Sequence, residues 1–350
     1  MKTKVITIKD IKIGGGNPIA VQSMWKDRLT YANLEEAAAR INSLKLIGCD
    51  ILRFAIPDME TAEVLGELAQ LVSMPLVADI HFDYKLALRY MDFPIAKIRI
   101  NPGNIGGKDK VKVVLEKAAA KSIPIRIGVN AGSLPADLTA GIKPLDALVK
   151  AAEREISIFK EFGFDNYIVS MKASGIADTI EANRILSQRT DAPLHLGVTE
   201  AGPLVAGVVS SAVALTTLLK EGIGDTIRVS LSDTMENEVI AGREIIRAAG
   251  LKTGGVKIVS CPRCGRHGFD THGFTSRWLT KLYSLDKDIT VAIMGCEVNG
   301  PVEAKHADIG ITGAGDKVLI FRHGKIVKKI NVDEADEIFN EELEQVTGSK

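Results

Sequence analysis

Over residues 19–249 the chain repeats one pattern, a short apolar run rich in β-branched residues followed in most cases by a segment of helical periodicity. Strands that are buried on both faces have continuous apolar sequences, and alternating strands and helices require a parallel sheet. Eight such units in about 250 residues predict a (β/α)8 TIM barrel, an α/β fold; an open doubly wound sheet is the alternative. The eight runs are residues 19–24, 51–56, 75–80, 97–100, 123–129, 167–172, 194–199 and 226–231.

Segments with one apolar face predict the helices between these strands. Residues 201–219 carry no charge, but they contain glycine, proline, serine and threonine, so we expect a buried helix there and no membrane span. Residues 1–13 alternate and lead into three glycines, which predicts a small hairpin before the first barrel strand. The other predicted helices are residues 34–46, 59–72, 110–121, 145–162, 176–188 and 237–249.

The composition changes at residues 250–255, and this predicts two domains, residues 1–250 and residues 251–350. The second has strand and helix patterns in irregular order, as in a small α+β domain. Residues 310–315 resemble a phosphate-binding loop, but they open into a strand where such a loop opens a helix. We predict strands at 256–260, 289–294, 309–312, 318–321 and 325–330, and helices at 275–284 and 333–345.

Charge and cysteine content narrow the classes of partner and compartment. The 44 basic and 44 acidic residues balance, which argues against a nucleic acid or a membrane surface as the main partner. Only four cysteines are present and three of them are clustered, so we expect no disulfide framework and a reducing compartment. The amino-terminal residues lack the apolar core of a signal peptide, and we expect a cytoplasmic protein.

Cations recur at the ends of the predicted barrel strands, where active sites of this fold lie. Converging cations repel one another unless an anion lies among them, and guanidinium groups match phosphate oxygens in pairs. The pattern therefore predicts a pocket for a phosphate ligand with at least two negative charges. The cations are Arg53, Arg99, Arg126, Lys172 and Arg228.

Neutral and acidic groups occupy the same strand ends. Asp79, His81 and Glu200 titrate, and each could donate a proton or orient a donor. Glu200 stands out because it follows a strand end among cations, although it could also neutralise one of them. Cys49 lies beside a glycine before the second strand, and we expect it to be buried. The neutral hydrogen-bonding candidates are Asn101, Asn130, Ser174 and Ser230.

The three clustered cysteines predict a metal centre. Cys261 and Cys264 are three apart, and Cys296 follows a later strand beside a Gly-Pro loop. A zinc site would add a fourth thiolate or a histidine, for which His267, His272 and His306 are candidates. An iron–sulfur cluster tolerates three thiolates and a different fourth ligand. The spacing leaves both open, and the predicted phosphate pocket favours the redox-active cluster.

Six motifs resemble those of the 4-hydroxy-3-methylbut-2-enyl diphosphate synthase family, the iron–sulfur enzymes of the methylerythritol phosphate route to isoprenoids. They occur in matching order over nearly the whole chain, and they are long and specific. The motifs are PLVADIHFD at 75–83, RINPGNI at 99–105, RIGVNAG at 126–132, LGVTEAG at 196–202, SCPRCGR at 260–266 and GCEVNGP at 295–301.

The resemblance implies a [4Fe–4S] cluster with Cys261, Cys264, Cys296 and Glu303 as ligands. It implies two-electron reductive opening of a cyclic diphosphate with loss of water, during which a substrate oxygen displaces Glu303. The five cations match diphosphate-binding positions, His81 and the four neutral side chains complete the substrate site, and Glu200 matches the proton donor. The family implies a flavodoxin or ferredoxin as electron donor, and a head-to-tail homodimer in which one cluster domain covers the other barrel.

Two departures from the family pattern and two rival functions remain. Trp25-Lys26-Asp27 stands where the family usually has a Thr-Asn-Thr-like run, and Val302 replaces the glycine before Glu303. Glycine alone visits positive φ freely, so Val302 raises the question whether the loop can present Glu303 as a ligand. The rivals are a non-redox barrel enzyme with a structural zinc, and an iron–sulfur sensor whose barrel only binds a metabolite.

Overall fold

The computed structural model describes residues 2–134, 136–139, 141–251 and 255–348. The chain divides into two compact units, residues 1–253 and 254–350, and each is described by itself. The predicted domain boundary at residue 250 adjoins residues 252–254, which lie outside the described residues. No helix among the described residues is both long enough and apolar enough to cross a membrane.

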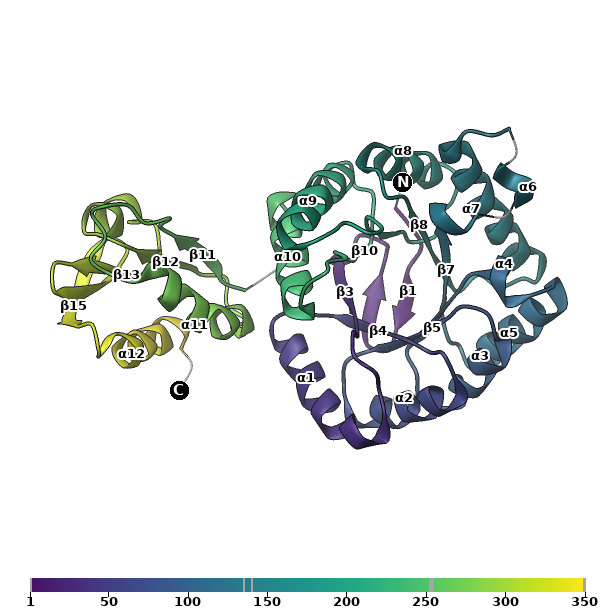
Figure 1. Ribbon diagram of the computed structural model, residues 1–350, viewed down its shortest axis with the longest axis horizontal. Coiled ribbons are helices and arrows are strands. Elements are labelled where there is room, and N and C mark those ends of the chain that lie inside the picture. Colours follow the sequence, from purple (N-terminus) through teal and green to yellow (C-terminus); the bar gives the residue numbers. More distant parts are fainter. Residues whose placement is uncertain (1, 135, 140, 252–254, 349–350) are drawn as a thin grey trace. The chain divides into compact units, whose positions relative to one another are not determined.

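The first unit is the predicted (β/α)8 barrel. Eight strands form one parallel sheet in the order β8-β7-β6-β5-β4-β3-β10-β9, and a bridge between Val169 and Leu194 joins its two ends. The ring of helices lies outside the strands (Figure 1). The strands are β3 (Ala20–Met24), β4 (Ile51–Ala55), β5 (Leu76–Ile80), β6 (Lys97–Ile100), β7 (Ile125–Asn130), β8 (Tyr167–Lys172), β9 (His195–Leu196) and β10 (Thr226–Ile227). The helices are α1 (Leu34–Leu46), α2 (Met59–Leu71), α3 (Tyr84–Tyr90), α4 (Pro102–Ile105), α5 (Lys108–Ala120), α6 (Ala136–Thr139), α7 (Pro144–Glu161), α8 (Ile176–Ser187), α9 (Leu204–Lys220) and α10 (Met235–Ala248).

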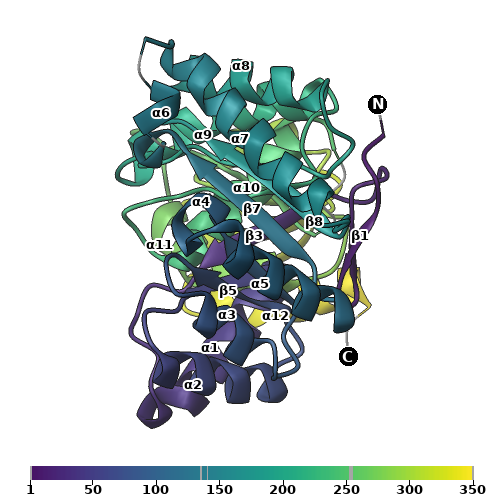
Figure 2. The same cartoon turned by 90° about the vertical axis from the view of Figure 1, so that its right-hand side faces the viewer.

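A hairpin closes the amino-terminal end of the barrel. Its strands β1 (Ile6–Ile8) and β2 (Ile11–Ile13) pair antiparallel as predicted. In Figure 2 β1 lies at one end of the barrel strands, while α4 and α6 lie at the other. Because the hairpin isoleucines pack on the first inward side chains of the strands, this end is apolar and the polar side chains gather at the carboxyl ends. The apolar cluster contains Ile6, Ile8, Ile13, Ala20, Ile51, Val77, Ala96 and Ile168.

The barrel differs from the sequence predictions in several features, among them the short helices α4 and α6, which were not predicted. Strands β9 and β10 are two residues each, shorter than predicted, because the chain after them turns into the loops at the strand ends. Helix α3 was not predicted; it is a short helix that begins after Asp83, whose side chain accepts a hydrogen bond from the Lys85 amide. The buried helix predicted at residues 201–219 is present as α9, but only one of its faces is buried; on the other face Val205, Val209 and Val213 are 77%, 57% and 49% exposed.

The second unit is a five-stranded sheet with two helices, the α+β arrangement predicted from its sequence. Strands β11, β12 and β13 run parallel, and β14 and β15 extend the sheet antiparallel. The glycine run at 310–315 lies in and directly after β13, as expected for a strand and not for a phosphate loop. The elements are β11 (Lys257–Ser260), α11 (Thr271–Ser284), β12 (Thr290–Met294), β13 (Ile309–Ala314), β14 (Lys317–Arg322), β15 (Lys325–Asn331) and α12 (Ala335–Thr347).

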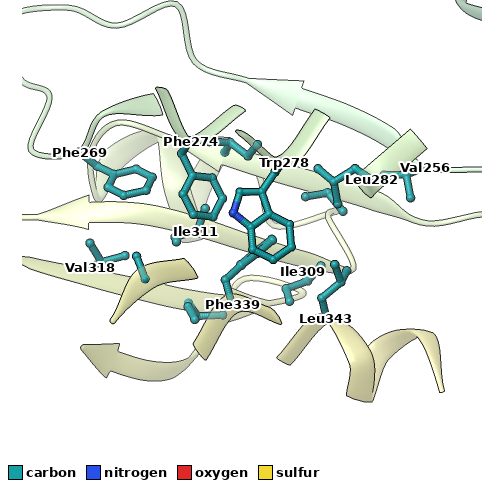
Figure 3. Close-up of a cluster of buried hydrophobic side chains, with 14 residues drawn as sticks. Val256, Phe269, Phe274, Trp278, Leu282, Ile309, Ile311, Val318, Phe339 and Leu343 are labelled. Atoms are coloured by element: carbon teal, nitrogen blue, oxygen red, sulfur yellow. The ribbon is translucent and has the colours of Figure 1, made fainter. Parts of the chain in front are cut away.

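Aromatic side chains form the core of this unit (Figure 3). Trp278 of α11 stacks on Phe274 with ring centroids 5.5 Å apart and meets Phe339 of α12 edge to face at 5.0 Å. The Trp278 indole N–H donates to Asp336 Oδ1 at 2.6 Å, so this ring is buried with its polar atom satisfied. The packed core supports the ends of β11 and β12, from which the cysteine-bearing loops leave.

Candidate active site

The carboxyl ends of the barrel strands surround a cavity of about 220 Å³, which we call the rim cavity. All five predicted cations line it: Arg53, Arg99, Arg126, Lys172 and Arg228. His81, Asn130, Glu200 and Ser230 from the predicted set line it too, together with Met24, Asp79 and Thr199. Residues that are far apart in the sequence therefore meet in one pocket, as the β/α repeat predicts.

Two glycines make room for the cations. A Cβ atom at Gly128 would lie 2.3 Å from Arg99 Nε, and one at Gly197 would lie 2.7 Å from Lys172 Nζ. Both distances are shorter than any contact a side chain tolerates. The two glycines occur within the motifs RIGVNAG and LGVTEAG, so this packing gives those motif positions a physical reason.

Asp79 is shared at close range by two of the cavity cations. Its Oδ1 accepts a 2.9 Å hydrogen bond from Arg99 Nη1, and its Oδ2 lies 3.4 Å from Arg53 Nε. Burial by itself would raise the pKa of Asp79, but Arg53, Arg99 and Arg126 together outweigh burial and bring the pKa to about 2. The Asp79 carboxylate therefore stays ionised and holds two arginines in place.

The nearby carboxylates do not balance this ring of cations: Asp79 pairs with Arg53 and Arg99, and Glu238 lies 3.6 Å from Arg228. Arg126 and Lys172 make no ion pair within the described residues. Burial, and then the neighbouring arginines, hold the pKa of Lys172 well below its usual value. Arg126 Nη1 donates to Ser170 Oγ at 2.7 Å, whereas its Nε and Nη2 have no hydrogen-bond partner within the described chain. Buried donors without acceptors are costly, and an anion in the cavity would supply the acceptors.

Glu200 and His81 are the titratable groups at the mouth of the cavity. Glu200 is exposed and has φ +54°, a left-handed conformation that is uncommon outside glycine and is found at active sites. His81 Nε2 lies 3.4 Å from Arg99 Nη1, and burial, only partly offset by Asp79, lowers the pKa of His81. The imidazole is therefore neutral near pH 7 and offers a hydrogen bond without adding charge.

The structure also separates some predicted residues and adds others. Asn101 and Ser174, both within the described chain, do not line the rim cavity: Asn101 is buried directly before α4, and Ser174 is exposed after β8. Their substrate contacts remain predictions. Thr199 was missed, although it continues the inward alternation of His195 and Gly197 and could have been found by that period.

Glu238 is a functional candidate that the sequence did not indicate. It lies on α10, which Thr234 caps by accepting a hydrogen bond from the Asn237 amide. Its fully buried carboxylate accepts from Ser23 Oγ at 2.7 Å and from the Leu231 amide at 3.0 Å. Arg228 Nη2 lies 3.6 Å away. The sequence pattern that could have indicated Glu238 is an acidic residue on the barrel face of a predicted helix, where the other positions are apolar.

The same carboxylate explains the departure at Trp25-Lys26-Asp27. Lys26 Nζ lies 3.1 Å from Glu238 Oε1 and donates to the carbonyls of Leu231 and Asp233, so it ties the loop after β3 to the loop after β10. Trp25 is buried and stacks on Phe54. The run that departs from the family pattern thus packs against the edge of the rim cavity.

In the second unit, the cysteines lie beyond the ends of two paired parallel strands. The Cys261 amide donates to the Ile293 carbonyl at 2.9 Å, directly after β11, and Cys296 follows Gly295 after β12. A Cβ at Gly295 would lie 3.7 Å from Cys261 Sγ, which places that thiol beside the start of the Cys296 loop. Cys261 is buried, Cys264 is exposed and Cys296 is partly exposed.

Asn299 connects Cys296 with Glu303. Cys296 Sγ lies 3.3 Å from Asn299 Oδ1, and Asn299 Nδ2 donates to Glu303 Oε2 at 2.8 Å. Both ring nitrogens of His267 are engaged, with the Cys264 carbonyl at 2.7 Å and Arg263 Nη2 at 2.8 Å. Three thiols and a nearby carboxylate form a donor set that suits iron, although no three potential ligands lie within metal-binding reach of each other in the described chain.

Val302 does not impair the loop that carries Glu303. It is exposed in the helical turn Val298–Glu303 and is not among the described residues with positive φ. The glycine that this turn requires is Gly300, which has φ −68° and ψ −105°, and whose Cβ would lie 2.6 Å from Thr312 Cγ2. Thr312 Oγ1 in turn donates to the Cys296 carbonyl at 2.7 Å.

Solved structures with the same barrel share the fold at low sequence identity. Dihydropteroate synthase of Xanthomonas albilineans superposes with a TM-score of 0.52 and 13% identity over 70% of this chain and 96% of that chain. N-acetylneuraminic acid synthetase of Leptospira borgpetersenii gives 0.51 and 15% over 71% and 90%. Both similarities extend over about as many residues as the first unit contains, and they support the barrel assignment.

Family and sequence comparisons cover both units. The family models GcpE TIM-barrel domain and GcpE protein C-terminal domain match residues 3–243 and 257–345. A Treponema denticola protein named 4-hydroxy-3-methylbut-2-en-1-yl diphosphate synthase (flavodoxin) is 50% identical over 97% of this chain and 96% of its own length. One of the same name from Caldicellulosiruptor saccharolyticus is 47% identical over 97% and 98%. The chain therefore belongs to the GcpE family of 4-hydroxy-3-methylbut-2-en-1-yl diphosphate synthases (flavodoxin), a family of oxidoreductases.

Proposed function

We propose that this protein opens the ring of 2-C-methyl-D-erythritol 2,4-cyclodiphosphate reductively to give 4-hydroxy-3-methylbut-2-enyl diphosphate, with uptake of two electrons and loss of water. The observation that carries the proposal is the rim cavity, which is lined by five cations and by two carboxylates, Asp79 and Glu200. Glu238, which is not part of this lining, lies 3.6 Å from Arg228, so positive charge still predominates around the cavity. A ligand with two phosphoryl groups supplies the missing negative charge and the missing hydrogen-bond acceptors.

The positions of the side chains support the proposed substrate-binding roles. The five cations bind the diphosphate, and Asn130, Ser230 and the neutral His81 hydrogen-bond the remaining oxygens. Asp79 keeps Arg53 and Arg99 oriented before the substrate arrives, which lowers the cost of ordering them on binding. Asn101 and Ser174 belong to the proposed site as residues of the same strand ends.

Glu200 is the proposed proton donor. Loss of the substrate hydroxyl as water requires a proton at that oxygen. Asp79 is unsuited because its ion pairs keep it ionised, with a pKa of about 2. Glu200 lines the cavity, is open to solvent and makes no ion pair with the cations within the described residues, so it can be reprotonated after each turnover.

The proposed cofactor is a [4Fe–4S] cluster held by Cys261, Cys264, Cys296 and Glu303. When bound, such a cluster passes electrons singly, which suits a two-electron reduction supplied by flavodoxin or ferredoxin. All four cysteines are free thiols, as a reducing compartment requires, and we propose the cytoplasm. In this assignment residues 1–250 bind the substrate and residues 251–350 carry the cluster.

A head-to-tail homodimer is the proposed assembly, in which the cluster domain of one chain covers the barrel of the other. The exposed stripe of Val205, Val209 and Val213 on α9 supports association, because an apolar stripe on a barrel helix is otherwise left in water. Val209→Glu is expected to shift the protein towards monomer in analytical ultracentrifugation, with exposed Val113→Glu on α5 as control. An unchanged sedimentation coefficient would exclude α9 from the interface.

Anaerobic turnover tests the function. Protein purified without oxygen should be coloured and contain iron, and after chemical reduction it should convert the cyclic diphosphate into the ring-opened diphosphate, followed by phosphorus NMR. A colourless protein that contains zinc would contradict the cluster. Binding of the cyclic diphosphate to reduced, iron-loaded protein without product would favour a sensor over an enzyme.

A further inference from the structure

Lys97 is a fully buried lysine that the site described above does not use. It lies on β6 two residues before Arg99, so both side chains point into the barrel, about 7 Å apart along the strand. Lys97 does not line the rim cavity and lies one layer below it, above the apolar cluster formed with the hairpin. A charged lysine between an apolar cluster and a ring of cations is energetically unfavourable.

The neighbours of Lys97 offer almost no compensation. Its Nζ donates to Gln22 Oε1 at 3.4 Å, the single hydrogen bond that it makes within the described chain. No carboxylate of the described residues lies within ion-pair distance of Nζ, and Asp79 pairs with Arg53 and Arg99 instead. Burial first, and then Arg126 and Arg53, hold the pKa of Lys97 well below its usual value. A buried position with one long hydrogen bond and no carboxylate at ion-pair distance thus favours the neutral amine over the charged one.

The charged and titratable groups around Lys97 come from every side of the barrel. His195 is also neutral: burial, and then the cations, keep its pKa low, and its Nδ1 lies 2.7 Å from Thr226 Oγ1. The carboxylate of Asp79 is committed to Arg53 and Arg99 in the layer above. The facing groups are Gln22 (β3), Arg53 (β4), Asp79 (β5), Arg99 (β6), Arg126 (β7), Lys172 (β8), His195 (β9) and Arg228 (after β10).

We propose that Lys97 takes up one proton when a diphosphate occupies the rim cavity, and so adds a positive charge directly beneath the bound anion. The proton comes from solvent: the amine lone pair forms the new N–H bond, and the buffer or water loses the proton. Burial, and then repulsion from Arg126 and Arg53, disfavour the charged amine in the free protein. Two negative charges in the cavity offset that repulsion and attract the protonated amine. The proton leaves again when the anion dissociates.

Proton uptake makes Lys97 a positioning residue whose charge appears only when the site is filled. The free barrel avoids a further buried cation, and the complex gains one. By linkage, the affinity for the diphosphate rises as the pH falls towards neutrality, and proton and anion strengthen each other's binding by the same factor. The inference rests on the proposed function only in that a diphosphate binds in the rim cavity.

Isothermal titration calorimetry in buffers of different ionisation enthalpy tests this inference. Anaerobic holoprotein is titrated with the cyclic diphosphate near neutral pH, where the phosphodiester groups of that ligand do not titrate. The slope of observed enthalpy against ionisation enthalpy should show uptake of about one proton by the wild type, which Lys97→Met should abolish while weakening binding about tenfold. The exposed Lys112→Met should keep the full uptake.

Each other outcome has one meaning. Binding by the wild type with no proton uptake overturns the inference and leaves the proposed function standing, whereas absence of any binding overturns the proposed function. Uptake that persists in Lys97→Met but disappears in His195→Gln assigns the proton to the histidine and also overturns the inference. If Lys97→Met does not fold, Lys97→Gln replaces it, and the carbon NMR shift of lysine Cε in labelled wild type must move from a neutral to a charged value on binding.

Discussion

Asp79 Oδ1 and Arg99 Nη1 are joined by a 2.9 Å hydrogen bond at the carboxyl ends of neighbouring strands β5 and β6. The two residues are also register partners in the sheet, so the pairing of the two strands itself places the aspartate carboxylate beside the arginine. Arg53 on the other side shares the second carboxylate oxygen at 3.4 Å. The cavity that we propose to bind a diphosphate thus contains a fixed carboxylate, which orders Arg53 and Arg99.

Asp79→Asn should destabilise the protein by about 3 kcal/mol at neutral pH, because two buried arginines lose their counter-charge. The pKa of Asp79 is lower in the folded protein, about 2, than the unfolded value of about 3.9. Its stabilisation is therefore fully present above the unfolded pKa and is lost as the pH falls through about 2. Urea unfolding across this range measures the difference, with the exposed Asp137→Asn as control; equal stability of wild type and Asp79→Asn at neutral pH would contradict the pairing.

Glu238→Gln should keep the hydrogen bonds to Ser23 and Leu231 but leave Arg228 without its buried counter-charge. We expect a loss of about 3 kcal/mol in stability and weaker binding of the diphosphate. Lys26→Met, which removes the more exposed partner, should cost about 1 kcal/mol or less. If Lys26→Met proves as damaging as Glu238→Gln, the lysine and not the carboxylate organises this edge.

Cys296→Ser should abolish iron binding, because a hydroxyl is a poor ligand for iron compared with a thiolate. Glu303→Ala should lower the iron content less, since three thiolates remain. Iron analysis and the visible absorption of anaerobically purified protein measure both. Equal loss in the two variants would argue against Glu303 as the exchangeable fourth ligand.

Gly300→Ala should disturb the same loop more than Val302→Gly does. A Cβ at residue 300 collides with Thr312, which holds the Cys296 carbonyl, whereas residue 302 is exposed and needs no positive φ. We expect Gly300→Ala to lose most of its iron and Val302→Gly to retain it. A higher iron content in Val302→Gly than in wild type would show that Val302 does hinder the ligand loop.

Glu155 of α7 gives the protein a measurable pH dependence. Burial, opposed only in part by Arg154, raises the pKa of Glu155 to about 7, and its Oε2 has no hydrogen-bond partner in the described chain. The protonated side chain favours the folded state fully below the unfolded pKa of about 4.3, and this contribution is lost as the pH rises through about 7.

Glu155→Gln should therefore be more stable than wild type at pH values above about 7, and its stability should change less between about 4.3 and 7. Thermal unfolding at several pH values checks this. Glu116→Gln, at an exposed position of α5, should leave the pH dependence as it is. A parallel pH profile for Glu155→Gln and wild type would mean that Glu155 is ionised in the folded protein.

The barrel and the chemistry of its rim could be predicted from the amino-acid sequence. Continuous apolar strands require burial on both faces, and the period of two along a strand places Arg126, Lys172 and their counterparts inside the barrel. Strand ends of parallel sheets share one edge, so the cations had to converge. The thiols at 261, 264 and 296 likewise indicated a metal centre, because their residue type and spacing carry that information locally.

Which of these groups pair depends on the three-dimensional arrangement of the elements. Glu238 reaches Arg228 and Lys26 from a helix outside the strands, and the sequence does not show these partners because they are far apart in the chain. The position of Lys97 below Arg99, by contrast, follows from the period of two along β6. The exposed valines of α9 are a further example. A run of uncharged residues predicts a helix that packs against other elements, but which of its faces is covered is set by its neighbours in space.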